Sequence, residues 1–255
     1  MKKLKEILSS IKYFFTFRFK HGEKVDIVYP ISWETMSQED FRNVCTILGQ
    51  PHGRKESLFL CLCALAHIRP DNPVKYNPKA IRDNVVFIIG GQPYVISPKV
   101  IQEACSQLEY IYDKVGLAPS PIPRVDRKLY GISFEQYYEA DAYMLRYQAE
   151  KNEVWLKEAA KTLTNGYIRK LLPWQRKGIV IWWNGVKQYL KDKYPCIFQE
   201  GDGGSSFSDK TLEDILHELL SCMNDNKPQE NEKILKSDVH AVLFSLNKIY
   251  EKNAH

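Results

Sequence analysis

The sequence has no long hydrophobic run, and this absence argues against a membrane-spanning helix. A transmembrane helix needs about 20 consecutive, mostly apolar residues, and the longest apolar stretch, from Ser57 to Ile68, falls well short of that. The chain also has no Asn-x-Ser/Thr glycosylation site, and its basic start lacks a signal-peptide pattern because Lys12 interrupts the apolar stretch. We therefore expect a cytoplasmic protein.

The sequence motifs of nucleotide-binding and hydrolytic enzymes are missing as well. The glycine-rich segment 201–206 has no lysine after a glycine, so it does not match a phosphate-binding loop. Gly90 and Gly91 join two predicted strands, whereas a dinucleotide-binding fingerprint joins a strand to a helix. There is no Gly-x-Ser-x-Gly elbow, and His217-Glu218 lacks the second histidine of a zinc-protease motif. We predict a protein that is not an enzyme, with no catalytic residues and no cofactor.

The cysteines fit structural roles better than metal binding. Most of the six lie inside apolar helical patterns, which is typical of reduced, buried thiols. Cys63 and His67 are one helical turn apart and have the chemistry of metal ligands, but Cys61 faces another side of the same helix. We therefore predict inert core thiols and no metal site.

Three acids on a later predicted helix, Glu135, Glu139 and Asp141, resemble a carboxylate cluster. Acids near the start of a helix are stabilised by the helix dipole without any catalytic role. We interpret them as structural.

Hydrophobic periodicity indicates an α+β fold that is mainly α, in which N-terminal helices and two β-hairpins precede an all-helical C-terminal part. The first domain, residues 1–116, is predicted to hold a helix over 2–11, a hairpin over 15–29 turning at Gly22, a helix from Ser37 to Gly49, a helix over 55–68, a hairpin over 85–96 and a helix from Pro98 to Gly116. Pro93 makes the last strand an edge strand, because proline lacks the N–H that a central strand needs.

A proline-rich connector, residues 117–130, is predicted to follow as an extended spacer in which 125–127 are exposed. Beyond it we expect a helical domain over 131–200, a flexible linker over 201–208 and an acidic C-terminal helical pair over 209–255. The predicted helices cover 134–151, 153–163, 173–194, 209–223 and 237–252, and the residues expected to pack inside are Trp155, Leu156, Ala159 and Leu163.

One segment, residues 167–193, combines basic and aromatic side chains. It has seven Lys or Arg against one acid, and such a pattern can hold single-stranded nucleic acid by phosphate contacts and base stacking. An exposed tryptophan face could instead contact a protein, although at least one ring of the adjacent pair on this helix must pack inside. The candidate contact residues are Trp174, Arg176, Lys177, Trp182, Trp183 and Lys187.

Residues 29–37 read Tyr-Pro-Ile-Ser-Trp-Glu-Thr-Met-Ser, which is similar to a proline followed by Trp-Glu-Glu-Leu-Thr. That pattern occurs in proteins from the tail-gene regions of phages and prophages of Bacteroides-type bacteria, which this chain resembles. Further similar segments lie at 131–138, 182–185, 194–195, 213–217, 232–237 and 242–247. The resemblance implies a tail-assembly chaperone or adaptor that binds other tail proteins and does no chemistry. The hairpin-rich first domain departs from a purely helical chaperone, which leaves a structural role in the virion open.

The leading hypothesis is therefore a non-enzymatic phage or prophage assembly or structural adaptor protein, in the bacterial cytoplasm or incorporated in a virion, whose partners are other phage or assembly proteins. The alternative is a nucleic-acid-binding module that uses residues 167–193. The sequence does not indicate the oligomeric state.

Overall fold

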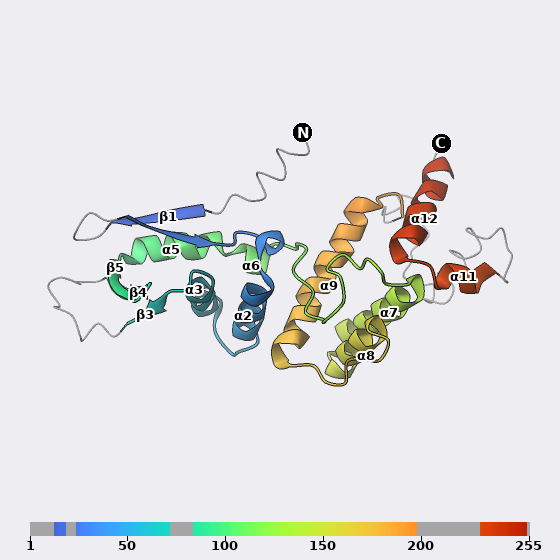
Figure 1. Ribbon diagram of the computed structural model, residues 1–255, viewed down its shortest axis with the longest axis horizontal. Coiled ribbons are helices and arrows are strands. Elements are labelled where there is room, and N and C mark those ends of the chain that lie inside the picture. Colours follow the sequence, from blue (N-terminus) through green and yellow to red (C-terminus); the bar gives the residue numbers. More distant parts are fainter. Residues whose placement is uncertain (1–12, 19–23, 72–83, 198–229, 254–255) are drawn as a thin grey trace. The chain divides into compact units, whose positions relative to one another are not determined.

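The computed structural model describes residues 13–18, 24–71, 84–197 and 230–253 (Figure 1). The fold is α+β and mainly helical, as the sequence predicts. The described residues form two compact units: the first takes in residues up to Pro121 together with Pro173–Ile181, and the second takes in Ile122–Leu172 and the residues from Trp182 onward. The predicted helices over 2–11 and 209–223 and the predicted linker over 201–208 lie outside the described residues.

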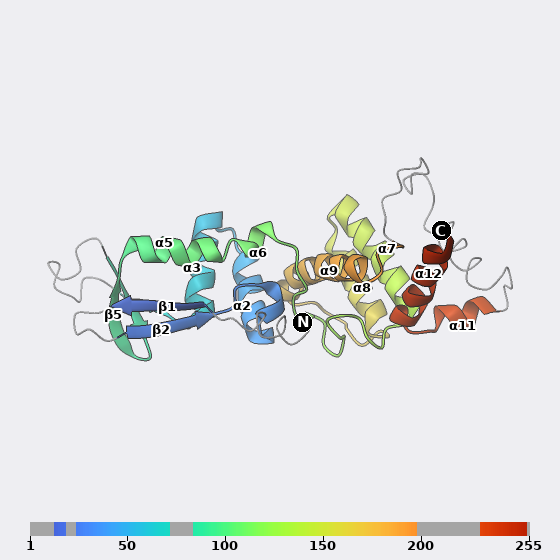
Figure 2. The same ribbon diagram turned by 90° about the horizontal axis from the view of Figure 1, so that it is seen from above.

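The first unit begins with the antiparallel strands β1 (Tyr13–Arg18) and β2 (Lys24–Tyr29), in which Tyr13 pairs with Tyr29. This pairing confirms the first predicted hairpin, and its predicted turn at Gly22 lies outside the described residues. Helix α5 (Pro98–Gln107) runs beside the hairpin of β1 and β2 in both Figure 1 and Figure 2. The Tyr29 hydroxyl donates a hydrogen bond of 3.3 Å to Gln107 Oε1 on this helix.

Helix α2 (Gln38–Leu48) follows the short 3-10 helix η1 (Trp33–Thr35) and begins where the sequence predicts. Ser37 caps α2, because its hydroxyl accepts the Asp40 backbone N–H at 3.1 Å. Helix α3 (Arg54–Leu65) ends three residues earlier than predicted. The reason is a left-handed residue at His67 (φ 53°), which lets the Ile68 N–H turn back to the Cys63 carbonyl at 2.9 Å.

A three-stranded antiparallel sheet has the order β3 (Arg69–Pro70), β4 (Val85–Ile89), β5 (Gln92–Ile96). It confirms the second predicted hairpin, and Pro93 lies on the edge strand as expected. Gly90 and Gly91 have φ of 55° and 85°, which suits the two-residue turn. The sequence missed β3, because the prolines after Arg69 indicate only a helix break.

Residues 98–116 form two helices where one was predicted. Ser97 caps α5, but α5 ends at Gln107, with Leu108 as its C-cap, and a separate turn, α6 (Tyr110–Asp113), follows. The break lets the Tyr110 ring pack edge-on against Trp33, with ring centroids 5.7 Å apart. The Trp33 indole N–H donates to the Lys114 carbonyl at 3.0 Å, so tertiary packing overrides the local helical pattern.

The proline-rich segment after Gly116 is only partly exposed. Of residues 125–127, which were predicted to be exposed, Asp126 is exposed and Arg127 is half-buried, but Val125 is buried, which corrects the prediction there. Leu117, Ala118 and Val125 are buried, because these side chains join the core. Within the first unit, the side-chain amides of Gln38 and Gln175 donate to the carbonyls of Ser120 and Pro121, each at 2.9 Å. The predicted division into five segments stays a prediction.

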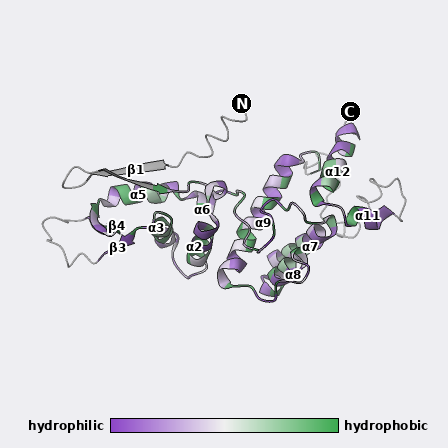
Figure 3. Cartoon of the chain, viewed as in Figure 1, coloured by the Kyte–Doolittle hydropathy of each residue, from purple (hydrophilic) through white to green (hydrophobic). Residues whose placement is uncertain are grey.

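The second unit contains α7 (Phe134–Glu150), α8 (Glu153–Leu163), the C-terminal half of α9 (Pro173–Lys193), α11 (Asn231–Leu235) and α12 (Val239–Asn253). The four longer helices match predicted ones, and α11 was not predicted. Figure 3 shows apolar and polar residues mixed along α7 and α8, while α12 changes from apolar at its start to polar at its end.

Local signals explain where α7 and α8 begin. Ser133 and Gln136 form a capping box at the start of α7, and the Asn152 side chain accepts the Val154 N–H to start α8. Leu156, Ala159 and Leu163 are buried as predicted, whereas Trp155 is half-buried.

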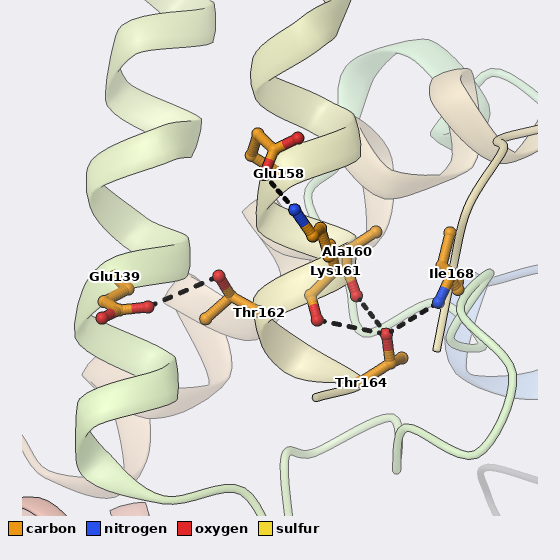
Figure 4. A network of polar contacts seen from close by, with 7 residues as sticks. All are labelled: Glu139, Glu158, Ala160, Lys161, Thr162, Thr164 and Ile168. Carbon is orange, nitrogen blue, oxygen red and sulfur yellow. Dashed lines mark hydrogen bonds and ion pairs between the residues drawn. The ribbon is translucent and has the colours of Figure 1, made fainter. Parts of the chain in front are cut away.

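A network of polar contacts joins α7 to α8 and ends α8, as Figure 4 shows. Glu139 on α7 accepts a hydrogen bond of 3.4 Å from the Thr162 hydroxyl on α8. The Thr164 hydroxyl donates to the Ala160 carbonyl at 2.8 Å and accepts the Ile168 N–H at 3.3 Å. These bonds satisfy backbone groups that the end of a helix leaves open.

Candidate functional site, a tyrosine and lysine cluster

The six candidate contact residues fall in two units. Trp174, Arg176 and Lys177 belong to the first unit, where Lys177 is exposed and the other two are half-buried. The Trp174 indole N–H is buried and has no hydrogen-bond partner in the described part of the chain. The other three candidate residues, Trp182, Trp183 and Lys187, belong to the second unit.

Trp182 and Trp183 are both buried, at 0% and 2% exposure, so neither ring can stack on a base or meet a partner. This corrects their assignment as surface contacts. The Trp182 indole N–H donates to the Arg127 carbonyl at 2.9 Å, and the Trp183 N–H donates to Asp141 Oδ1 at 3.1 Å. The face of α9 that carries these rings points to the core of the second unit, and the two indoles pack edge to face.

Lys187 lies beside Trp183 but has a structural partner. Its ammonium group is 2.7 Å from Asp141 Oδ2 and 3.4 Å from the Tyr137 hydroxyl. Burial of its side chain lowers the pKa of Lys187, but the charges of Tyr137 and Asp141 outweigh burial and raise it above its ordinary value. The pair therefore holds α9 to α7.

A different set of polar aromatic side chains gathers on the second unit, and we call it the tyrosine–lysine cluster. Its members come from the loop before α7, the end of α9 and the start of α12, and they are Lys128, Tyr130, Tyr189, Lys193, Tyr194 and His240. The bridge between Ser133 and Asp238 joins the start of α7 to the start of α12. The Val239 N–H also donates to the Ile132 carbonyl at 2.9 Å, which places His240 beside the loop.

Lys193 is the centre of the cluster. Its ammonium nitrogen lies 5.1 to 5.5 Å from the ring centroids of Tyr130, Tyr189 and Tyr194. It also lies 3.3 Å from the Tyr130 hydroxyl and 3.2 Å from His240 Nδ1. Burial lowers the pKa of Lys193, and hydrogen bonds to the tyrosines outweigh burial, so the pKa lies above its ordinary value and the lysine is charged at neutral pH.

Both ring nitrogens of His240 are engaged. Nε2 lies 2.7 Å from the Lys128 carbonyl, which can only accept, so Nε2 carries the proton. Nδ1 then accepts, and the Tyr194 hydroxyl lies 2.9 Å from it. Burial lowers the pKa of His240, and the Lys193 charge lowers it further, so the imidazole is neutral at neutral pH.

Tyr130 forms the exposed side of the cluster. Its side chain is 51% exposed, and its ring centroid lies 4.4 Å from the His240 ring. Hydrogen bonds with Tyr189 and Lys193 lower its pKa, because both groups stabilise the phenolate. The surface thus offers a rigid aromatic ring with a polarised hydroxyl.

The nearby acids are occupied by backbone amides. Asp126 Oδ1 accepts the Lys128 N–H at 2.7 Å, and Asp238 accepts the N–H groups of Gly131 and His240 at 2.9 and 2.8 Å. Neither Lys128 nor Lys193 makes an ion pair within 4 Å in the described part of the chain. The Lys128 ammonium group therefore has no described counterion, whereas hydrogen bonds to Tyr130 and His240 already hold the ammonium group of Lys193.

Sequence reasoning identified only part of this cluster. Tyr189 and Lys193 lie in the predicted basic and aromatic segment, one helical turn apart. Lys128, Tyr130 and His240 come from a loop and a distant helix, and no pattern in the sequence connects them to that segment.

Comparison with protein-family models, with curated proteins and with solved structures gave no match for this chain. Within the described ranges, no three His, Cys, Asp or Glu side chains lie close enough together to hold a metal ion. No helix in those ranges is both long and apolar enough to cross a membrane.

Proposed function

We propose that this protein is a non-enzymatic assembly or adaptor protein that acts through contacts with other proteins. The observation that carries the proposal is the tyrosine–lysine cluster. Tyrosine is enriched at the energetic centres of protein interfaces, because its ring gives a large contact area and its hydroxyl a hydrogen bond at little entropic cost. Tyr130 is half-exposed and held by Lys193, Tyr189 and His240, so it is ordered before a partner arrives.

The environments of His240, Cys61 and Cys63, whose side chains are of types that often take part in catalysis, support a non-enzymatic role. Both nitrogens of His240 have hydrogen-bond partners within the protein, which fits a structural role for this ring. Burial raises the pKa of Cys61 and of Cys63 to about 12, so both thiols are protonated and unreactive at neutral pH.

Phage or prophage tail assembly is the context that we propose for these contacts. This part of the proposal is supported by the resemblance of residues 29–37 and 131–138 to tail-region proteins. In that setting the partners are other tail proteins, and the protein acts in the bacterial cytoplasm or remains in the virion.

Co-purification tests the proposal. The full chain, expressed with the proteins encoded beside it, should retain at least one of them through gel filtration. Tyr130→Ala should weaken that complex about tenfold, or ~1.4 kcal/mol, since it removes the exposed ring. Tyr112→Ala is the matched control, because Tyr112 is 41% exposed and also stacks with a cation, Arg54, but lies in the first unit. A chain that binds none of the neighbouring proteins would refute the proposal.

Nucleic-acid binding is the second candidate, and the two lysines of the cluster without an ion pair favour it. Fluorescence anisotropy with single-stranded and duplex DNA at two salt concentrations tests this function directly. Phosphate contacts must weaken steeply as salt rises, and Lys193→Gln should lower the salt slope by about one. If binding does not depend on salt concentration, or if Lys193→Gln leaves it unchanged, nucleic-acid binding by the cluster is excluded.

A further inference from the structure

The second unit has a cavity of about 220 Å³, which we call the Arg124 cavity. Its lining combines three buried apolar residues, which we call the floor, with residues that are exposed or half-buried, which we call the rim. The floor consists of Val125, Ile132 and Leu163. The other lining residues are Pro123, Arg124, Gly131, Gln136, Thr164, Asn165 and Tyr167. A pocket that combines apolar side chains with a few polar groups is the usual form of a small-molecule site.

Arg124 is the single charged residue that lines this cavity, and no acid lines it. Its guanidinium lies 4.5 Å from the ring centroid of Tyr167, which is 60% exposed. Arg124 makes no ion pair or hydrogen bond with another side chain in the described ranges. When a guanidinium stacks on an aromatic ring, its N–H groups point outward, parallel to the ring. They can then bind both oxygens of a carboxylate.

Asn165 supplies a second donor. Its Oδ1 accepts a hydrogen bond of 3.1 Å from Gln136 Nε2, so its amide nitrogen is the end left without a described partner. Gln136 is itself fixed, because its oxygen accepts the Ser133 N–H at 3.1 Å and its nitrogen donates to the Thr162 carbonyl at 2.9 Å. The Thr164 hydroxyl is used by Ala160 and Ile168, as Figure 4 shows, so it adds no acceptor.

The two donors stand on unusual backbone. Arg124 and Asn165 have φ of 66° and 50°, in the left-handed region that residues with a side chain rarely adopt. Such conformations cost of order 1 kcal/mol each and are typical of binding sites. At Asn165 this conformation ends α8, because the Gly166 N–H turns back to the Lys161 carbonyl at 2.8 Å, so only the conformation of Arg124 has no helix end to explain it.

Size and charge together define the ligand. Pockets for drug-sized ligands measure about 300–1,000 Å³, so a cavity of about 220 Å³ admits only a compact group. Two donors, one of them cationic, and no acid select an anion. The apolar floor gives no partner to a highly hydrated dianion such as phosphate, and it favours a hydrocarbon group next to a single negative charge.

We propose that the Arg124 cavity binds a carboxylate that carries a compact apolar group, with the carboxylate on Arg124 and Asn165 and the apolar group on the floor. The source of this chemistry is either a small organic acid or the free C-terminus of a peptide that ends in an apolar residue. The inference does not depend on the tyrosine–lysine cluster or on the proposed assembly role.

Titrations of the full chain followed by ¹⁵N NMR test this inference, with 3-phenylpropionate as the probe and its neutral amide as the comparison. The acid should shift the side-chain amide signal of Asn165 and should bind at least tenfold more tightly than the amide, since a charged hydrogen bond contributes about 1.5–3 kcal/mol. Equal binding of acid and amide, or an unmoved Asn165 signal, would overturn the inference.

Arg124→Gln should lower the affinity for 3-phenylpropionate about tenfold. Arg146→Gln is the matched control, because Arg146 is also an exposed arginine stacked on an aromatic ring, that of Trp155 at 5.1 Å, but does not line the cavity. Asn165→Asp is a second variant that keeps a residue tolerant of left-handed backbone and should abolish binding by charge repulsion. The inference is contradicted if Arg124→Gln and Arg146→Gln lose the same affinity for 3-phenylpropionate. It is also contradicted if Asn165→Asp binds this acid as tightly as the unchanged protein does.

A short peptide that ends in phenylalanine distinguishes the two sources. If the free peptide binds more tightly than 3-phenylpropionate and its C-terminal amide does not bind, the ligand is a peptide C-terminus. If the small acid binds and the free peptide does not, the ligand is a small organic acid. If neither binds, the inference fails.

Discussion

The Lys187 ammonium group lies 2.7 Å from the Asp141 carboxylate, and this contact joins α9 to α7 in the second unit. Asp141 also accepts the Trp183 indole N–H at 3.1 Å, so one carboxylate orients both a lysine and a buried ring. The side chain of Asp141 is 20% exposed and that of Lys187 is 39% exposed, so water screens part of their attraction.

Asp141→Asn should destabilise the protein by about 1–2 kcal/mol, because the asparagine keeps an acceptor for Trp183 but leaves the Lys187 charge without a counterion. Urea unfolding at neutral pH measures the change. Glu139→Gln is the control, since it alters another carboxylate of α7, whose contact with Thr162 is exposed, and it should cost less than about 0.5 kcal/mol. Similar losses in the two variants would contradict the structural role of the pair.

Stability should fall in alkali as Tyr137 begins to titrate in the unfolded chain. Burial raises the pKa of Tyr137 from 10.0 to about 12, so above pH 10 the unfolded state loses its proton first. The stabilisation is complete below pH 10 and is lost as the pH rises toward 12. Tyr137→Phe should flatten this part of a curve of unfolding free energy against pH, and an unchanged slope would show that Tyr137 does not contribute to it.

Val125→Asp should destabilise the protein by about 3 kcal/mol or more, because Val125 is 7% exposed and a carboxylate there must give up its water. Thermal and urea unfolding both report this loss. Val154→Asp, at a position that is 53% exposed, should change stability by less than about 0.5 kcal/mol. A small loss of stability in Val125→Asp would instead support the exposed connector that the sequence predicts.

One tyrosine should titrate below the ordinary tyrosine pKa, because hydrogen bonds with Tyr189 and Lys193 stabilise the Tyr130 phenolate. A spectrophotometric titration of phenolate absorbance measures it in the folded protein. Tyr130→Phe should remove the early component, and Lys193→Met should move it to higher pH. An early component that persists in Tyr130→Phe would assign the signal to another ring.

Local patterns predicted most helices correctly, because their signals lie within a few residues of each other. Ser37 and Ser133 cap α2 and α7 as the sequence indicates, and the glycine pair joins β4 to β5. Predictions failed where a distant contact decided the outcome. The Trp33 and Tyr110 rings meet because the helix breaks at Leu108, a contact between residues far apart in the chain.

The candidate surface shows the same division. The sequence marked 167–193 as basic and aromatic, but it could not decide which side of α9 faces inward. Trp182 and Trp183 are buried, so the exposed chemistry moves to Lys193 and its tyrosines. That outcome depends on the packing of α7 and α12 around the helix, which amphipathic spacing alone does not specify.

The sequence by itself determined the class of fold and the positions of most of the described helices, because hydrophobic period, caps and turn residues act over one or two turns of chain. Only the tertiary structure decided what is available to bind. The cluster draws Tyr130, Lys193 and His240 from three separate elements, and the Arg124 cavity forms between a loop and the end of α8. Burial and convergence of this kind depend on contacts between residues far apart in the chain, and no local pattern encodes them.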